Sequence, residues 1–240
     1  MALGLILSSF FKALGQIGDR RFRRVLGIGI ILTLALLVLA YAGLLMLLQG
    51  LFGDSATLPL IGEVTWIGQL LGWSSLVLMI LLSVVLMVPV ASAIISLFLE
   101  DVARAVEDRH YPHVAAPAPV PFWDTARDAV NFLGVLIVAN ILALVLYAFL
   151  APMALFIFWG LNGYLLGREY FTLVAMRYLG RDGARQMRRR HAGAIWAAGV
   201  LMAMPLSVPL INLTVPILGA ATFTHLYHGL RARGDGDSAG

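Results

Sequence analysis

Cysteine is absent from this 240-residue chain, and charged residues make up only 12% of it. Without cysteine the chain has neither disulfides nor thiolate chemistry, so its redox compartment stays undetermined. The low charge accompanies a hydrophobic fraction of 60%, whereas soluble domains have about 25% charged residues. This composition excludes an ordinary soluble domain and indicates a membrane protein.

Recognisable catalytic motifs are also missing. The chain has no Gly-rich phosphate loop, no nucleophile elbow and no HExxH sequence, so we expect no enzyme, no cofactor and no metal. His225 and His228, spaced i and i+3, allow a metal or haem role or amphipathic anchoring at the membrane edge, and no third ligand is nearby in sequence. The pI of 9.8 does not indicate nucleic-acid binding, because the basic residues adjoin apolar segments.

Four long uncharged tracts dominate the chain. A helix of roughly 20 apolar residues crosses a hydrocarbon core of about 30 Å, and each tract is long enough to do so. The tracts are 25–53, 64–99, 129–167 and 192–230. No soluble core explains four such tracts, so we interpret them as membrane segments.

Basic residues are confined to a few segments. All 17 Lys and Arg residues lie outside 52–63, the short segment between the first two tracts. Cytoplasmic loops collect Lys and Arg. If each of the last two tracts enters the membrane and returns, both termini and segments 100–128 and 168–191 share the cytoplasmic side.

Prolines divide the last two tracts. Pro152 lies near the middle of the third, and Pro205, Pro209 and Pro216 interrupt the fourth. Proline removes a helical hydrogen bond and clashes with the preceding turn. We therefore interpret each tract as a helical hairpin, some of whose arms enter the bilayer without spanning it. Kinked single spans are the alternative.

The predicted fold class is an all-α integral membrane protein. It contains two long transmembrane helices, two Pro-broken and partly inserted helical hairpins, and an N-terminal interfacial helix. We expect a single membrane domain over 1–230 and a flexible tail at 231–240. The predicted elements are the interfacial helix at 3–18, the long helices at 22–52 and 64–109, and the hairpins at 129–167 and 192–230.

The first of these elements has apolar residues at helical spacing, with Ser9, Lys12 and Gln16 elsewhere on the wheel. This pattern suits a helix in the membrane interface; an ordinary amphipathic packing helix is the alternative. The second long helix continues beyond the membrane through LEDVARAVEDR and ends before Pro112.

An arginine-rich block, 19–24 (DRRFRR), opens the first long helix. The N-terminus of a helix carries a positive macrodipole and free N–H groups. A small oxyanion there would satisfy both the guanidinium groups and the backbone donors. The alternative is that these arginines set the topology and bind lipid phosphates. The arginines of 185–190 allow the same two interpretations.

A second charged group lies at the inner end of the second long helix. Arg104 has Glu100 and Asp108 at i−4 and i+4, which allows ion pairs along one helix. These side chains line the mouth of a pore or form a solvated helix end.

The order of these segments resembles the CysZ sulfate permease family, which shares its domain with the etoposide-induced membrane proteins. The resemblance covers about 10–230 and rests on several pieces in sequence. They are the arginine-containing turn before the first long helix, LFLEDVARAVEDRHYP at 97–112, NGYLLGREYF at 162–171 and PLINLTVPILGAATFTHLY at 209–227. The resemblance implies two long transmembrane helices with two pairs of partly inserted helices.

The resemblance also implies site residues. The family's sulfate site is a Gly-apolar-Arg-Arg turn, whose last three positions correspond to Phe22, Arg23 and Arg24, while Arg21 takes the place of the glycine. Family residues of the inner pathway correspond to Glu107 and Arg109, and Arg104 lies beside them.

The function that follows is a conduit for inward movement of sulfate, or a similar small oxyanion, in support of cysteine synthesis. The expected location is the bacterial inner membrane, with several passes. We expect sulfate, membrane lipids and further copies of the chain as partners, and no nucleic acid. The alternative is a non-transporting membrane scaffold or lipid-interacting protein of the same domain family.

Overall fold

The structure is a computed structural model that describes residues 2–52, 56–58, 62–64, 90–91, 94–95, 97–115, 117 and 120–237. Its contacts divide the chain into two compact units, each described by itself. Unit 1 comprises 1–26 and 96–240, and unit 2 comprises 27–95.

The described residues are almost entirely helical, as predicted. The α-helices are α1 (Ala2–Gly15), α2 (Arg20–Phe52), α5 (Leu99–His110), α6 (Phe122–Phe149), α7 (Ala154–Arg190), α8 (Ala192–Ala203), α9 (Pro209–Asn212) and α10 (Val215–Asp237). Two short 3₁₀ helices, η2 (Ala151–Met153) and η3 (Met204–Ser207), lie between them. The strands β1 (Ala56–Leu58) and β2 (Gly62–Val64), which were not predicted, pair antiparallel with Thr57 opposite Glu63.

Two helices of the described chain are long and apolar enough to cross a membrane. They are Arg20–Gly43, within α2, and all of α6. The first agrees with the predicted long helix at 22–52. Most of the other predicted long helix, 64–109, lies outside the described residues; its end is α5.

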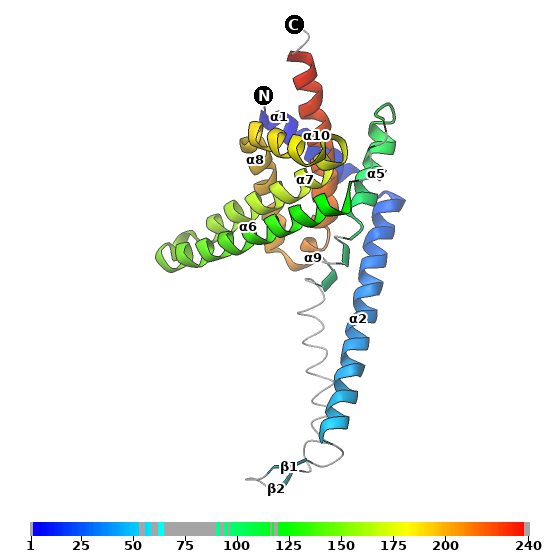
Figure 1. Cartoon of the computed structure of the whole chain (residues 1–240), viewed down its shortest axis with the longest axis vertical. Coiled ribbons are helices and arrows are strands. Elements are labelled where there is room, and N and C mark those ends of the chain that lie inside the picture. The colour runs from blue at the N-terminus through cyan, green and yellow to red at the C-terminus, as the bar shows by residue number, and fades with distance from the viewer. Residues whose placement is uncertain are drawn as a thin grey trace. The chain divides into compact units, whose positions relative to one another are not determined.

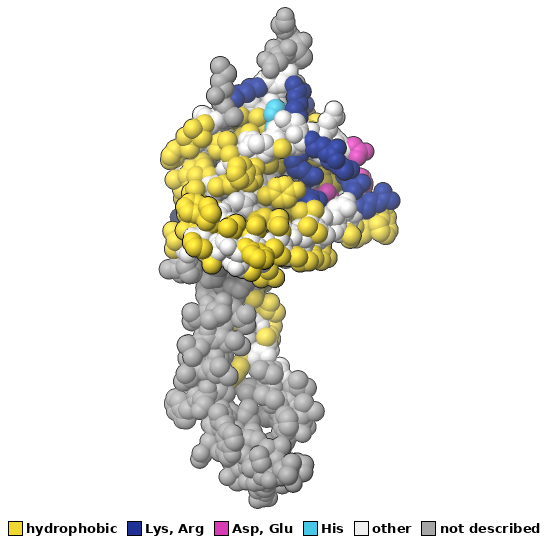
Figure 2. Space-filling model, turned by 90° about the vertical axis from the view of Figure 1, so that its left-hand side faces the viewer, with side chains coloured by type: hydrophobic (Ala, Val, Ile, Leu, Met, Phe, Trp, Pro, Cys, Tyr) yellow, Lys and Arg dark blue, Asp and Glu magenta, His cyan; other side chains and the backbone are white. Residues whose placement is uncertain are grey.

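Helix α6 exposes its apolar residues. Ile137 is 51% exposed, Leu144 69% and Phe149 82%, and Ala139 is its one buried residue. A core helix of a soluble protein would bury such side chains, since large exposed apolar surfaces mark contact with a partner or lipid. Hydrophobic side chains likewise cover much of the described surface in Figure 2. This exposure supports the membrane class.

Helices α6 and α7 form the first predicted hairpin (Figure 1). The turn falls at η2, which contains Pro152, as expected. The bounds differ from 129–167, however, because α6 begins already at Phe122, directly after Pro121. At the other end α7 continues to Arg190, through a segment that we had treated only as a connection.

Gly180 bends α7. Its φ of +65° lies in the left-handed region, which a residue with a Cβ atom adopts only at a cost. The helix therefore consists of two parts, before and after this residue. The bend matters for the arrangement of the arginines that follow it.

The second predicted hairpin is interrupted at its prolines. Helix α8 ends at Ala203, and η3 and α9 occupy the stretch between Pro205 and Asn212 before α10 begins. The expected tail at 231–240 is shorter than predicted, because α10 runs to Asp237. Leu, Arg and Ala are good helix formers, so LRAR over 230–233 offers no stop signal.

Glycines allow α7 and α8 to approach closely. A Cβ atom added to Gly199 would lie 1.9 Å from the carbonyl oxygen of Gly163, and one added to Gly167 would lie 2.7 Å from the oxygen of Ile195. The indole N–H of Trp196 also donates to the carbonyl of Gly160 at 3.0 Å. This contact fixes the start of α8 against the first part of α7.

Helix α1 packs on α10 with an unexpected face. Ile6, Ser9 and Ala13 are buried, as is Gln16 directly after the helix, whereas Leu3 is 66% exposed. The contact with α10 agrees with the packing-helix alternative, and the exposed leucines agree with the interfacial one. The interfacial position of α1 stays a prediction.

Candidate functional site

Asp19 caps the start of α2. Its Oδ1 accepts a hydrogen bond from the backbone N–H of Arg21 at 2.9 Å, and its carbonyl oxygen accepts one from Arg23 N–H at 3.0 Å. Aspartate is a preferred N-cap because its carboxylate satisfies a donor that the helix leaves free. One anionic group of the protein itself therefore already occupies part of this helix end.

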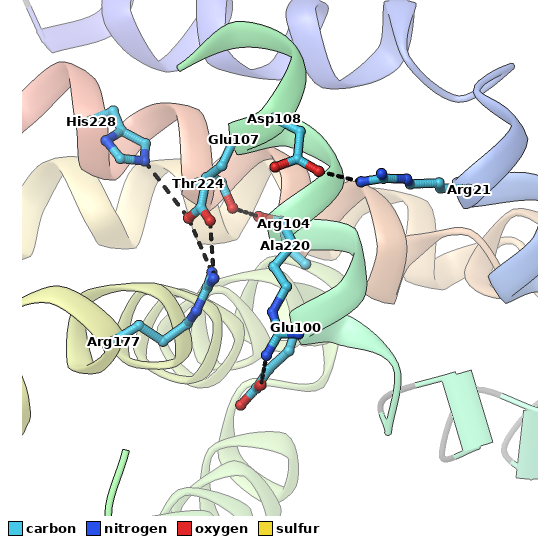
Figure 3. A network of polar contacts seen from close by, with 9 residues as sticks. All are labelled: Arg21, Glu100, Arg104, Glu107, Asp108, Arg177, Ala220, Thr224 and His228. Carbon is cyan, nitrogen blue, oxygen red and sulfur yellow. Dashed lines mark hydrogen bonds and ion pairs between the residues drawn. The ribbon is translucent and has the colours of Figure 1, made fainter. Parts of the chain in front are cut away.

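Two ion pairs join the start of α2 to the end of α5. The Arg21 guanidinium donates to Asp108 (Figure 3). Arg109 in turn lies 3.2 Å from Asp19 Oδ2. The first pair has its arginine at the start of α2 and its aspartate on α5, and the second pair has the reverse arrangement. Together they set how the two helix ends lie against each other. Exposed pairs of this kind contribute little stability and serve mainly to orient the two ends.

The predicted sulfate-site residues divide into three groups. Phe22 is 1% exposed and anchors the helix start in unit 1. Arg21 is engaged with Asp108, as described. Arg23 and Arg24 are exposed, and neither has an acidic partner within the part of the chain that the structure describes.

Glu107 lies at the centre of a buried polar network (Figure 3). Arg177 of α7 donates to both of its oxygens, at 3.0 and 2.9 Å, in a bidentate pair. His228 Nε2 of α10 lies 3.8 Å from Glu107 Oε1. Glu107 is 7% and Arg177 5% exposed. Burial acts to raise the pKa of the Glu107 carboxyl, but His228 and Arg177 outweigh it and hold the pKa below its ordinary value.

The three predicted pathway residues thus lie in different surroundings. Arg109 pairs with Asp19, and Arg104 pairs with Glu100 of its own helix at 3.4 Å, with both side chains largely exposed. Glu107 alone points inward, where its pair with Arg177 fixes α5 against α7. Arg177 was not predicted, although a lone arginine in the apolar stretch FTLVAMRY is itself a signal, since such charges are buried only when paired.

His225 and His228 belong to an aromatic cluster with Tyr111. The Tyr111 hydroxyl and His225 Nδ1 are 2.9 Å apart, and the Tyr111 ring stacks on His228 at 4.2 Å. Burial raises the pKa of the Tyr111 hydroxyl. Among the described residues no group of three or more His, Cys, Asp or Glu side chains could hold a metal ion. The contacts of the two histidines with Tyr111 join α10 to the end of α5.

A comparison with protein families gives one match over most of the chain. The model of the family described as sulfate transporter CysZ/etoposide-induced protein 2.4 matches residues 9–216. The chain belongs to this family. It is thus a membrane protein of a sulfate-transporter family, which is not an enzyme family. Neither the curated proteins nor the solved structures give a match.

The match of the CysZ family begins before Asp19, includes α2, α5, the first hairpin, α8 and α9, and ends at the start of α10. It therefore contains both the arginines at the start of α2 and the Glu107–Arg177 pair, whereas His228 lies beyond its end. Sequence alone had shown these as two separate groups, about 85 positions apart in the chain; the ion pairs between 19–21 and 108–109 bring them together.

Proposed function

We propose that this protein is a multi-pass conduit of the bacterial inner membrane that lets sulfate, or a similar small oxyanion, enter the cell for sulfur assimilation. The observation that carries this proposal is the arrangement at the start of α2. Arg23 and Arg24 are exposed there without an acidic partner among the described residues, while Asp19 and Arg21 are held by the end of α5.

The chemistry of this helix end suits a dianion. Sulfate needs several donors, and guanidinium groups supply them in a planar fork. The positive end of the helix macrodipole adds to their attraction. Because Arg21 is engaged with Asp108, we propose that Arg23 and Arg24 bind the anion and that Arg21 positions the turn.

The end of α5 supplies the next charges. We propose that Arg104 and Arg109 shape the inner part of the route, since both are exposed on α5. Glu107 would act by holding α5 in place through its buried pair with Arg177. In the same proposal the protein contacts membrane lipids and assembles with further copies of itself.

Flux of radiolabelled sulfate into proteoliposomes tests the activity. We expect uptake by the wild-type protein above that of protein-free vesicles, and competition by unlabelled sulfate but much less by chloride. Wild-type protein that inserts correctly and gives no uptake would favour the alternative, a non-transporting scaffold or lipid-interacting protein of the same family.

Sulfate binding tests the site. A charge-assisted hydrogen bond contributes about 1.5–3 kcal/mol, and 1.4 kcal/mol corresponds to one decade of affinity. Arg23→Ala and Arg24→Ala should therefore each weaken sulfate binding about tenfold or more. Arg20→Ala should have a smaller effect, and Arg127→Ala, which removes an exposed arginine from α6, serves as the matched control. Unchanged binding in both site variants would leave these arginines as topological anchors only.

A further inference from the structure

Unit 1 contains an arginine-lined cavity that is separate from the start of α2. Its volume is about 790 Å³, and its walls come from α6, from both parts of α7 and from the start of α8. The charged side chains that line it are Asp128, Arg168, Arg181, Arg185, Arg188 and Arg189. Lys and Arg side chains also gather on one part of the face seen in Figure 2.

The bend at Gly180 builds this cavity. Arg188 donates to the hydroxyl of Thr172 at 2.6 Å, although 16 positions separate the two residues. A straight helix would place them about 24 Å apart. The bend therefore returns the last turns of α7 over its first part, so that Arg168 shares one cavity with Arg181 and Arg188. The glycine-mediated contact of α8 closes the adjoining wall with Ile195 and Trp196.

The cavity has an excess of positive charge that its single acidic residue, Asp128, does not balance. Five arginines face one aspartate, and none of the five forms an ion pair with any described residue. Arg188 donates to a neutral hydroxyl instead, and burial together with Arg168 lowers the pKa of its guanidinium. Like charges brought together in a partly buried site repel one another unless an anion lies between them.

Arg168 is the most informative member of this group. It is 9% exposed, and its Nε has no hydrogen-bond partner among the described atoms. Its guanidinium lies 5.7 Å from the centre of the Phe132 ring, a contact that orients the group but does not neutralise it. Buried charges are normally paired and hydrogen-bonded, so an unpartnered donor on a buried arginine indicates a missing acceptor.

We propose that this cavity binds a tetrahedral oxyanion with two negative charges. The group is either a free ion, sulfate or phosphate, or the phosphomonoester of a membrane lipid. Arginine forks match the oxygens of such a group bidentately. The volume lies within the range of ligand pockets, about 300–1,000 Å³, so it accommodates a lipid headgroup as well as a hydrated ion. The choice of sulfate as a probe rests on the proposed function. The argument from the arrangement of the arginines is independent of it.

Binding is best measured in full-length protein carrying Arg23→Ala and Arg24→Ala, because the remaining signal then comes from outside the start of α2. Sulfate and inorganic phosphate are titrated at constant ionic strength, with chloride as the reference. In parallel, the same protein is placed in phosphatidylcholine nanodiscs with and without phosphatidic acid, and thermal stabilisation by the lipid is followed.

In this background Arg188→Gln should weaken binding of the preferred probe about tenfold or more. Arg168→Gln should do the same, and Arg181→Gln tests the site with a less buried residue if the Arg168 variant does not fold. Arg190→Gln is the matched control, because it removes an exposed neighbouring charge that does not line the cavity.

Arginine-dependent binding of sulfate or phosphate identifies a free ion, and arginine-dependent stabilisation by phosphatidic acid alone identifies a lipid. Both support the proposal. It is overturned if none of the probes binds, or if Arg190→Gln weakens binding as much as Arg188→Gln does. Sulfate flux is measured separately. If the protein transports sulfate but the cavity binds none of the probes, only this inference is overturned. If the cavity binds its probe but the protein transports no sulfate, only the proposed transport function is overturned.

Discussion

Glu107 and Arg177 meet in the interior of unit 1, where few other groups compensate either charge. Their side chains are 9% and 4% exposed, and both guanidinium terminal nitrogens are used in the contact. Removing water from two charges is costly, and a good bidentate geometry only offsets that cost. The pair is therefore weak evidence of high stability, and its bidentate geometry instead orients α5 against α7.

A double-mutant cycle tests this interpretation. Glu107→Gln and Arg177→Gln should each lower the free energy of unfolding by about 3–5 kcal/mol, because each leaves a buried charge without its partner. The double variant Glu107→Gln with Arg177→Gln should cost less than the sum of the two single changes. Thermal unfolding in detergent measures these differences.

Glu100→Gln is the control for this cycle, since the Glu100–Arg104 pair is exposed and should contribute below about 1 kcal/mol. Strictly additive effects at Glu107 and Arg177 would contradict the coupling.

The sequence was enough to predict which residues belong to the site, but not which side chains they would contact. Arg23 and Arg24 stand out because they open an apolar helix, and Glu107 because it continues the helix beyond the membrane. That Glu107 points inward to Arg177 depends on the rotation of α5 about its axis, which residue type does not specify. The same holds for Arg168, which forms no ion pair with a described residue and shares its cavity with the later arginines only because α7 bends.

Among the elements, α7 and α8 depend most directly on residue size. Gly163, Gly167 and Gly199 bring the two backbones together, and small residues serve helix contacts in membranes in the same way. No alternative side chain fits between Gly199 and the carbonyl of Gly163, which would lie 1.9 Å from an added Cβ.

Gly199→Ala should consequently separate α7 from α8 and lower the stability by about 1–3 kcal/mol, as overpacking does in other cores. Gly134→Ala is the matched control in α6, where nothing lies within 4 Å of an added Cβ. It should be neutral or slightly stabilising, because alanine favours a helix over glycine by up to about 1 kcal/mol. Equal thermal midpoints for the two variants would show that the close contact is not needed.

The helices and their breaks could be predicted from the lengths of the apolar segments and the positions of the prolines, which are local properties of the chain. Pro152 and Pro205 marked interruptions that the structure contains. The continuation of α7 to Arg190 did not follow, because arginine-rich segments look like connections when only polarity is considered. Arginine favours helices, and here the Thr172 contact of Arg188 and the α8 packing support it.

For the whole molecule, the segregation of charge predicts one orientation in the membrane. All 17 basic residues are expected on the cytoplasmic side, together with both termini. Because the native chain has no cysteine, single variants can be labelled without a background. Ser55→Cys should react with a membrane-impermeant thiol reagent from outside, whereas Ala115→Cys and Gln186→Cys should react only from inside. Reaction of the last two from opposite faces would contradict the hairpin topology.

The packing of α1 on α10 has a consequence for the order in which the protein is assembled. A Cβ atom added to Gly229 would lie 2.5 Å from Leu5, so the two helices meet closely although the whole of unit 2, the first hairpin and α8 are synthesised between them. Until residues 215–237 have left the ribosome, the buried side of α1, with Ile6 and Ser9, lacks its main partner, α10. Its exposed leucines can meanwhile hold it at the membrane surface. Unit 1 thus closes last, when its final helix returns to the first one.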